Sequence, residues 1–368
     1  MRDLSRVGIR NIRIAKSGLV EGFDSVEACA KKLIGIQAQY QQFGEISLFH
    51  RVSSGVTLDG LNRVYADGRL IKLWGQRTTV HLYGVDEWEN LNAIYAPRRT
   101  WVRKHCEELG VDLDDVLGKI DRLARTKRYV GKDEIAALLG EQAKKLMTWG
   151  GVLIEASLTG GIYAVPERPK TRFYAHRKWI SNESVESWTG DHAGAMEDFL
   201  YRYFACYGPA TLADFKHWSG LPNYVFMDAF RGIEERLERF DVDGKRYFLP
   251  VGDVDLARQD VVSSVKLLGK FDPLFVSFAD KGWFADKGWF ADLKYEREIW
   301  RTAGHIEAVI LVDGEIRGTW RYVIKGRNIA FTCYLFGGLS ASDKKRVKME
   351  AERLAGFLEK ELQAVSFE

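Results

Sequence analysis

The densest group of side chains that could do chemistry is a glutamine cluster near the N-terminus. Four of the chain's eight glutamines fall within Gln37-Ala38-Gln39-Tyr40-Gln41-Gln42, directly after the apolar run Leu33-Ile34-Gly35-Ile36. Residues at i and i+2 do not share a helix face, so Gln37 and Gln39 can act together only where the backbone is extended or turns off a helix end. A neutral amide is no general base, but its carbonyl and amino groups can orient a water molecule. On spacing alone, a polar helix end exposed to water is the favoured interpretation.

Basic residues alternate with aromatic or apolar ones in three further stretches, and this mixture suits contact with DNA phosphates. Each stretch taken alone is more often a solvated face of a helix or hairpin. Because the stretches fall on predicted hairpins and helix ends, the sequence favours DNA contact. The candidate DNA-binding residues are Arg77, Arg98, Arg99, Arg103, Lys104, Arg168, Lys170 and Arg172.

Other catalytic patterns are missing from the sequence. It has no GxxxxGK[ST] loop, no GxGxxG after a strand, no HExxH pair and no GxSxG elbow, so nucleotide, dinucleotide and zinc chemistry have no support. The histidines show no pairing with cysteine, and no metal or cofactor is predicted. The four cysteines stand far apart without a CxxC pair, which indicates reduced thiols in a cytoplasm.

The elements that must position these residues recur along the chain as helix, short helix, helix and hairpin. This order is the winged-helix arrangement, and a protein-interaction scaffold built from the same unit is the alternative. A first, weaker copy has helices at 7–16, 25–36 and 58–68 and a hairpin of 70–74 with 78–83. The second copy has helices at 112–127, 132–139 and 152–158 and a hairpin of 162–165 with 171–174. The third has helices at 195–206, 209–215 and 221–237 and a hairpin of 239–242 with 245–248.

The last third of the chain changes to a period of two, which indicates antiparallel strands. Strands are predicted at 306–312, 315–324 and 328–336, followed by a terminal amphipathic helix over 342–362. The predicted fold class is therefore α+β. Its four predicted parts are a first winged-helix unit with a connecting helix at 1–110, a second winged-helix unit at 111–192, a third at 193–262, and a β-rich region with the terminal helix at 263–368. An exact six-residue tandem repeat at 279–290 is interpreted as a duplicated surface loop.

Composition limits the remaining function classes. With 46% hydrophobic and 29% charged residues in 368, the chain can bury a large core and is predicted to be a globular protein. No apolar run reaches the roughly 20 residues of a membrane span, and the N-terminus lacks the features of a secretory signal. A net charge of +3 permits a polyanionic partner without requiring one, so the argument for DNA depends on where the basic residues lie.

Several short motifs, taken in order, resemble the AlkZ-like family of winged-helix DNA glycosylases. They are Gly35-Ile36-Gln37-Ala38-Gln39, Arg77-Thr78-Thr79-Val80-His81-Leu82, Tyr207-Gly208-Pro209-Ala210-Thr211, Lys270-Phe271-Asp272-Pro273-Leu274 and Gly318-Thr319-Trp320-Arg321. The resemblance spans essentially the whole chain. It implies a C-shaped body of tandem winged helices that holds double-stranded DNA, with a C-terminal β-rich part. The tandem repeat at 279–290 departs from the family pattern.

The resemblance also implies a catalytic Gln-apolar-Gln motif, which falls on Gln37 and Gln39. Glutamine rather than aspartate at position 39 places the chain with members that unhook interstrand crosslinks or remove bulky N7-alkylated purines. The expected activity is that of a monofunctional DNA glycosylase without cofactor, acting as a monomer in a bacterial cytoplasm, on the nucleoid. A winged-helix DNA-binding or regulatory protein without catalysis is the alternative.

Overall fold

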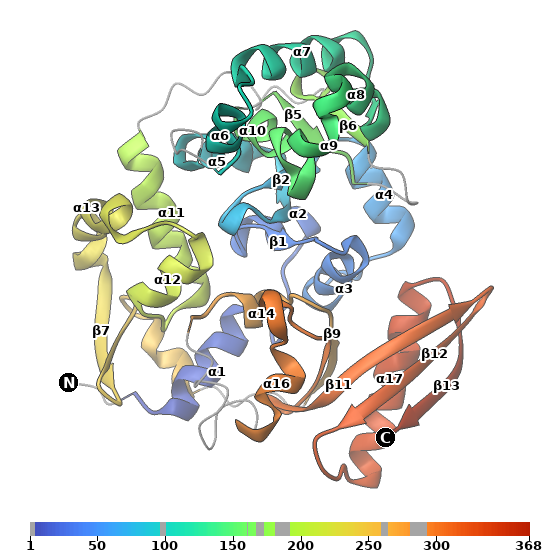
Figure 1. The fold of residues 1–368 in the computed structure, drawn as a ribbon. Coiled ribbons are helices and arrows are strands. Elements are labelled where there is room, and N and C mark those ends of the chain that lie inside the picture. Colours follow the sequence, from blue (N-terminus) through green and yellow to red (C-terminus); the bar gives the residue numbers. More distant parts are fainter. Residues whose placement is uncertain are drawn as a thin grey trace. The chain divides into compact units, whose positions relative to one another are not determined.

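The structure is a computed structural model of the 368-residue chain (Figure 1). It describes residues 4–95, 101–159, 161–166, 173–180, 192–258, 264–279 and 293–368. The chain forms two compact units. The first unit is discontinuous and contains residues 1–61 and 200–368, and the second unit contains residues 62–199. The four-part division expected from the repeats follows supersecondary units rather than compactness, and its boundaries stay a prediction.

The second unit combines helices with two hairpins. β2 (Leu70–Trp74) pairs antiparallel with β3 (Val80–Gly84), and β5 (Ile162–Ala164) pairs antiparallel with β6 (Phe173–His176). Both hairpins were expected. They share one sheet, because Lys72 of β2 pairs with Ala164 of β5 and β4 (Val130–Gly131) adds to β6. The strand order within this unit is β3-β2-β5-β6-β4.

The helices of the second unit follow the predicted order. α7 (Leu113–Thr126), α8 (Lys132–Leu139) and α10 (Val152–Leu158) confirm the three expected helices of the second copy. Asp112 caps α7 by accepting hydrogen bonds from the amides of Asp114 and Asp115, which satisfies donors at the helix start. The remaining helices of this unit are α5 (Trp88–Tyr95), α6 (Trp101–Glu108), the short α9 (Ala143–Leu146) and most of α4 (Leu58–Ala66).

The helical part of the first unit contains the third predicted copy. α11 (His192–Tyr207) enters this unit at its C-terminal end, and α12 (Leu212–Ser219), α13 (Asn223–Ile233) and the hairpin of β7 (Leu237–Val242) with β8 (Lys245–Pro250) follow. Thr211 and Asp214 form a capping box at the start of α12. The hairpin turns at Asp243 (φ 51°) and Gly244 (φ 73°), as an Asp-Gly pair with two left-handed residues favours.

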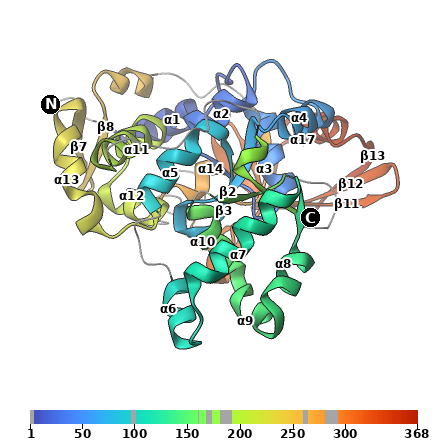
Figure 2. The same ribbon diagram turned by 90° about the horizontal axis from the view of Figure 1, so that it is seen from above.

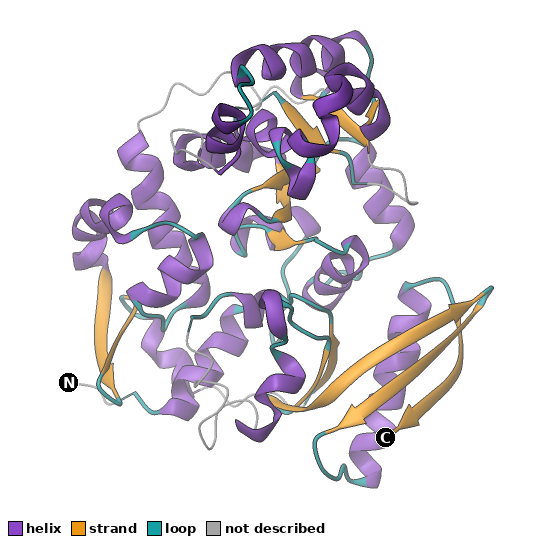
Figure 3. Cartoon of the chain, in the orientation of Figure 1, coloured by secondary structure: helices purple, strands orange, loops and turns teal. Residues whose placement is uncertain are grey.

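An antiparallel sheet with one parallel edge completes the first unit, as Figure 3 shows in orange. β9 (Val265–Leu268), β10 (Val309–Val312), β11 (Glu315–Lys325) and β12 (Asn328–Leu335) pair antiparallel in that order. α17 (Ala341–Phe357) then leads to β13 (Glu361–Phe367), which pairs parallel to β12. β11, β12 and β13 run alongside one another in Figure 2.

Two expected helices end early. The predicted helix over 25–36 stops as α2 (Val26–Lys32), because Ile34 (φ 52°) and Gly35 (φ 88°) turn the chain into the short strand β1 (Ile36–Gln37). The predicted terminal helix over 342–362 stops at Phe357, where Glu359 (φ 56°) turns the chain into β13. The N-terminal helix α1 (Arg6–Lys16) was expected, but α3 (Gln41–Arg51) was not.

Candidate active site

The segment Gln37-Ala38-Gln39 lies between the end of β1 and the start of α3. Gln37 has an extended backbone within β1 and is 6% exposed, and Ala38 is buried as well. Gln39 is exposed and lies in a bend one residue before Tyr40, the N-cap of α3. The backbone condition set by the i, i+2 spacing is therefore met. Because Gln37 is buried on a strand, it does not belong to a solvent-exposed helix end, which was the interpretation favoured by spacing alone.

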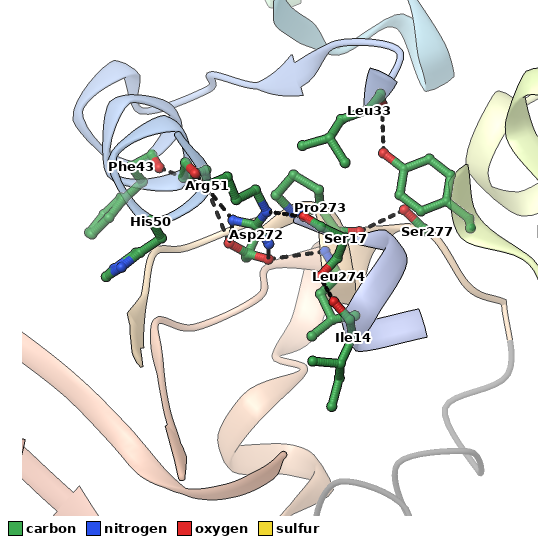
Figure 4. Close-up of polar contacts among 12 residues, drawn as sticks. Ile14, Ser17, Leu33, Phe43, His50, Arg51, Asp272, Pro273, Leu274 and Ser277 are labelled. Carbon is green, nitrogen blue, oxygen red and sulfur yellow. Dashed lines mark hydrogen bonds and ion pairs between the residues drawn. The ribbon is translucent and has the colours of Figure 1, made fainter. Parts of the chain in front are cut away.

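The turn that precedes Gln37 is fixed by hydrogen bonds from α11. The Tyr207 hydroxyl donates to the Leu33 carbonyl at 2.6 Å, a contact drawn in Figure 4, and Arg202 donates to the Lys31 carbonyl at 3.0 Å. Gly35 closes the turn by donating its amide to the Ala30 carbonyl at 2.8 Å. Because Tyr207 and Leu33 are both buried, this bond satisfies a carbonyl that water does not reach. The backbone leading into Gln37 is thereby held in one conformation.

The helix that follows Gln39 is fixed at its far end by a buried ion pair (Figure 4). Arg51, the last residue of α3, donates from both terminal nitrogens to the Asp272 carboxylate at 2.8 and 2.6 Å, and from Nε to the Ser17 carbonyl at 2.8 Å. Both side chains are fully buried. Burial opposes the charge on Arg51, but the Asp272 carboxylate outweighs it and raises the pKa of the guanidinium. Asp272 also caps α14 (Pro273–Val276) through the Leu274 amide at 3.0 Å.

Two further ionisable side chains of α3 are buried. His50 lies 2.8 Å from the Leu267 carbonyl through Nε2 and 3.0 Å from an Arg353 nitrogen through Nδ1. The same Nδ1 lies 3.2 Å from the Glu350 carboxylate. Burial lowers the pKa of His50, and Glu350 opposes that fall. Glu45, 3% exposed, accepts a hydrogen bond from Gln41 at 3.0 Å. Sequence reasoning missed this carboxylate, although the i, i+4 spacing of Gln41 and Glu45 was a usable signal.

The structure describes only some of the predicted DNA-binding residues. Arg98, Arg99, Arg168, Lys170 and Arg172 lie outside the described residues. Lys104 on α6 is 77% exposed beside Glu108. Arg103, on the same helix, instead pairs at 3.3 Å with the buried carboxylate of Glu155 on α10. Burial raises the pKa of Glu155, and Arg103 opposes that rise. DNA contact by these residues stays a prediction.

Arg77 lies in the turn between β2 and β3 and is half-buried with a left-handed backbone (φ 54°). The turn begins at Gly75, where a Cβ would overlap the Tyr83 hydroxyl. That hydroxyl donates to the buried side chain of Gln76. His81 is also buried, and burial lowers its pKa to about 3, with Arg77 adding to the effect. This hairpin is therefore a rigid support for the Arg77 side chain.

The described residues offer no obvious metal site, since nowhere among them do three His, Cys, Asp or Glu side chains gather. None of the helices in the described ranges is both long and apolar enough to cross a membrane.

The fold has a solved counterpart. The DNA glycosylase AlkZ of Streptomyces sahachiroi matches it with a TM-score of 0.81 over 100% of both chains, at 21% sequence identity. A relative from the same organism, an interstrand DNA cross-link repair glycosylase, is 25% identical over 315 residues, which cover 79% of this chain and 81% of the relative. Both similar proteins are named as DNA glycosylases, the class of enzymes that hydrolyse N-glycosyl bonds.

The family is more specific than the class. Residues 30–357 match the family described as DNA glycosylase AlkZ-like. The chain belongs to this AlkZ-like DNA glycosylase family, which confirms the resemblance carried by the sequence motifs.

Proposed function

We propose that this protein hydrolyses the N-glycosidic bond of N7-alkylated purines in double-stranded DNA, and that its substrates include interstrand crosslinks joined through such purines. The proposal is supported by family membership and by the name of the relative, a cross-link repair glycosylase. The single observation that carries it is a Gln-Ala-Gln segment whose first amide is buried on an extended backbone and anchored on both sides.

The reaction requires the protein mainly to position a water molecule. An N7-alkylguanine is a cation, so its glycosidic bond is already weak and the leaving base needs no proton. Gln37 and Gln39 would hold a water molecule at C1′ while the sugar develops oxocarbenium character, and fixed amide dipoles need no reorganisation as that charge forms. The buried Glu45 carboxylate, one helical turn beyond Gln41, is a candidate source of negative charge for that transition state.

The proposed reaction ends with an abasic site and an intact strand. A bifunctional glycosylase forms a Schiff base with an amine, and no lysine lies between Gly35 and Phe43. We therefore expect no covalent enzyme–DNA intermediate. Neutral lesions such as hypoxanthine should be processed far more slowly than N7-methylguanine, because an amide pair cannot protonate the leaving base.

DNA binding in this proposal uses the repeated helix–hairpin units as winged helices. The antiparallel hairpins β2–β3, β5–β6 and β7–β8 support that reading, and the C-shaped arrangement stays a prediction.

The deciding experiment measures base release from a duplex with one N7-methylguanine, read as strand breaks after alkali. Removing one oriented donor at such a site lowers the rate about 10²–10³-fold, so Gln37→Ala and Gln39→Ala should each be severely slowed and the double variant inactive. Duplex affinity should stay near that of the wild type. Gln142→Ala, at an exposed glutamine of the second unit, is the matched control and should retain full activity.

The outcomes separate the alternatives. Full activity in the double variant would reject the glutamine assignment. DNA binding by the wild type without base release would identify a non-catalytic DNA-binding protein, and neither binding nor release would identify a scaffold. A complex trapped by borohydride, or strand breaks before alkali, would show that an amine elsewhere performs the reaction.

A further inference from the structure

Directly after Gln39, the first unit presents an exposed aromatic ring. Tyr40 is 47% exposed. Its ring is nearly parallel to that of Phe271, with centroids 6.2 Å apart and an interplanar angle of 16°, and it meets the His305 ring edge-on at 6.2 Å. We call Tyr40, Phe271 and His305 the Tyr40 platform. Large exposed aromatics with aromatic support are typical of binding surfaces.

The platform is held rigidly from beneath. Phe43, one turn into α3, contacts the Tyr40 ring edge-on at 6.3 Å and the buried Trp320 ring at 6.2 Å. Phe271 directly precedes Asp272, whose carboxylate is locked by Arg51. A ring fixed in this way loses little conformational entropy when a ligand covers it, and this strengthens binding.

A cluster of cations adjoins the platform through His305. Lys270 lies 3.0 Å from His305 Nε2 and 2.7 Å from the buried carboxylate of Glu307, and Arg301 and Arg321 reach the same carboxylate at 3.4 and 3.6 Å. We call Lys270, Arg301, Arg321 and Glu307 the Glu307 cluster. Arg301 also pairs with Glu298 at 3.4 Å, so two carboxylates face three cations and one positive charge remains in excess. The Arg321 and Arg301 side chains are 57% and 42% exposed.

The two arginines of the Glu307 cluster keep N–H donors that a further anion can use. Each shares Glu307 with Lys270, so the carboxylate orients the guanidinium groups without saturating their five N–H donors. A phosphate that binds there would neutralise the excess positive charge, and guanidinium groups bind phosphate through paired hydrogen bonds. The surface thus offers an aromatic face and an anion site side by side, which are the two halves of a nucleotide.

We propose that the Tyr40 platform and the Glu307 cluster together bind the nucleotide that carries the lesion, with the purine stacked on Tyr40 and its phosphate on Arg301 and Arg321. The inference rests on the proposed function and names how that substrate is recognised. A purine of any kind can stack on an aromatic ring, and a cationic purine is attracted further by the electron-rich face of a tyrosine. The bound phosphate shields that purine from the cations of the cluster.

The test measures equilibrium binding, so that it does not depend on catalysis. The probe is a duplex with N7-methylguanine on a 2′-fluorinated sugar, which resists hydrolysis because fluorine disfavours the oxocarbenium ion, and the reference is the same duplex with guanine. The wild type should bind the lesion duplex more tightly. Tyr40→Ala should weaken lesion binding by about 5-fold or more, since stacking contributes about 1–3 kcal/mol per base, whereas Tyr40→Phe should retain most of it. Tyr224→Ala, at a tyrosine that is 84% exposed on α13, is the control and should keep the wild-type preference for the lesion duplex over the guanine duplex.

The cluster is tested by Arg321→Ala. This variant should weaken binding to both duplexes alike and lower the salt slope by about 0.9 for one lost phosphate contact. Arg317→Ala, on the same strand and 39% exposed, is the control and should leave the slope unchanged. Normal lesion binding by Tyr40→Ala, or an unchanged slope in Arg321→Ala, would overturn the inference even if the wild type releases bases. Tyr40-dependent binding without base release would instead overturn only the proposed chemistry.

Discussion

Replacing Arg51 by methionine should destabilise the first unit strongly. Arg51 and Asp272 are both fully buried and joined by two hydrogen bonds. Methionine fills similar volume but leaves the Asp272 carboxylate without its cation. Removing one partner of a buried ion pair costs about 3–5 kcal/mol. The lower end of this range is expected, because the carboxylate keeps its hydrogen bonds from the Leu274 amide and the Ser47 hydroxyl.

Asp272→Leu should cost at least as much. It leaves the Arg51 charge buried and also removes the cap of α14, which contributes about 1 kcal/mol. The double variant Arg51→Met/Asp272→Leu leaves no uncompensated charge, so it should be clearly less destabilised than the sum of the single variants. The difference between the double variant and that sum measures the coupling of the two side chains.

Urea unfolding at pH 7, analysed by linear extrapolation, gives the free energy of unfolding for each variant. Arg231→Met is the matched control, because Arg231 on α13 pairs with Asp228 at the surface and an exposed pair contributes about 0–1 kcal/mol. A loss below about 1 kcal/mol in Arg51→Met, or strict additivity in the double variant, would show that the pair does not anchor α3.

Four further predictions follow from burial and charge. Burial alone would raise the pKa of Glu350, but contacts with His50 and Arg353 lower it to about 2. Its stabilising effect is therefore complete above its usual pKa of 4.5 and is lost as the pH falls toward 2, so Glu350→Gln should flatten the acid side of a stability–pH curve. All four cysteines are buried, so a thiol reagent at pH 8 should label none in the native protein and all four in urea. Arg103→Ala should lower the free energy of unfolding, because the buried Glu155 carboxylate loses the cation that pairs with it. Lys104→Ala should leave stability unchanged and, by losing a phosphate contact, lower the salt slope of DNA binding by about 0.9.

Elements with local signals could be predicted from the sequence. The capping residue Thr211 and the Asp243-Gly244 turn mark α12 and the β7–β8 hairpin, and both signals act within a few residues. α3 gives no such signal. Nine of its eleven residues are buried, among them Glu45, His50 and Arg51, so it lacks the polar face by which a surface helix is recognised.

The candidate site likewise has one part that could be predicted from the sequence and one part that could not. The spacing of Gln37 and Gln39 required an extended backbone, and β1 provides it. The burial of Gln37 could not be predicted, because it depends on distant segments that fix the neighbouring turn and helix, including Tyr207 and Asp272. The stack of Tyr40 on Phe271 has the same origin, since residues so far apart in sequence show no pattern that joins them.

The discontinuity of the first unit also determines the order in which the two units can fold during synthesis. Arg51 and Asp272 are 221 residues apart, and a ribosome adds about 5–20 residues per second. The glutamine segment is thus synthesised early, but Asp272, which anchors α3, is added to the chain roughly 10–40 s after Arg51. During that interval the whole second unit, a continuous stretch of chain, is synthesised and can fold on its own contacts. We therefore expect the nascent protein to complete the second unit first, and to order the segment Gln37-Ala38-Gln39 only after Asp272 has been synthesised.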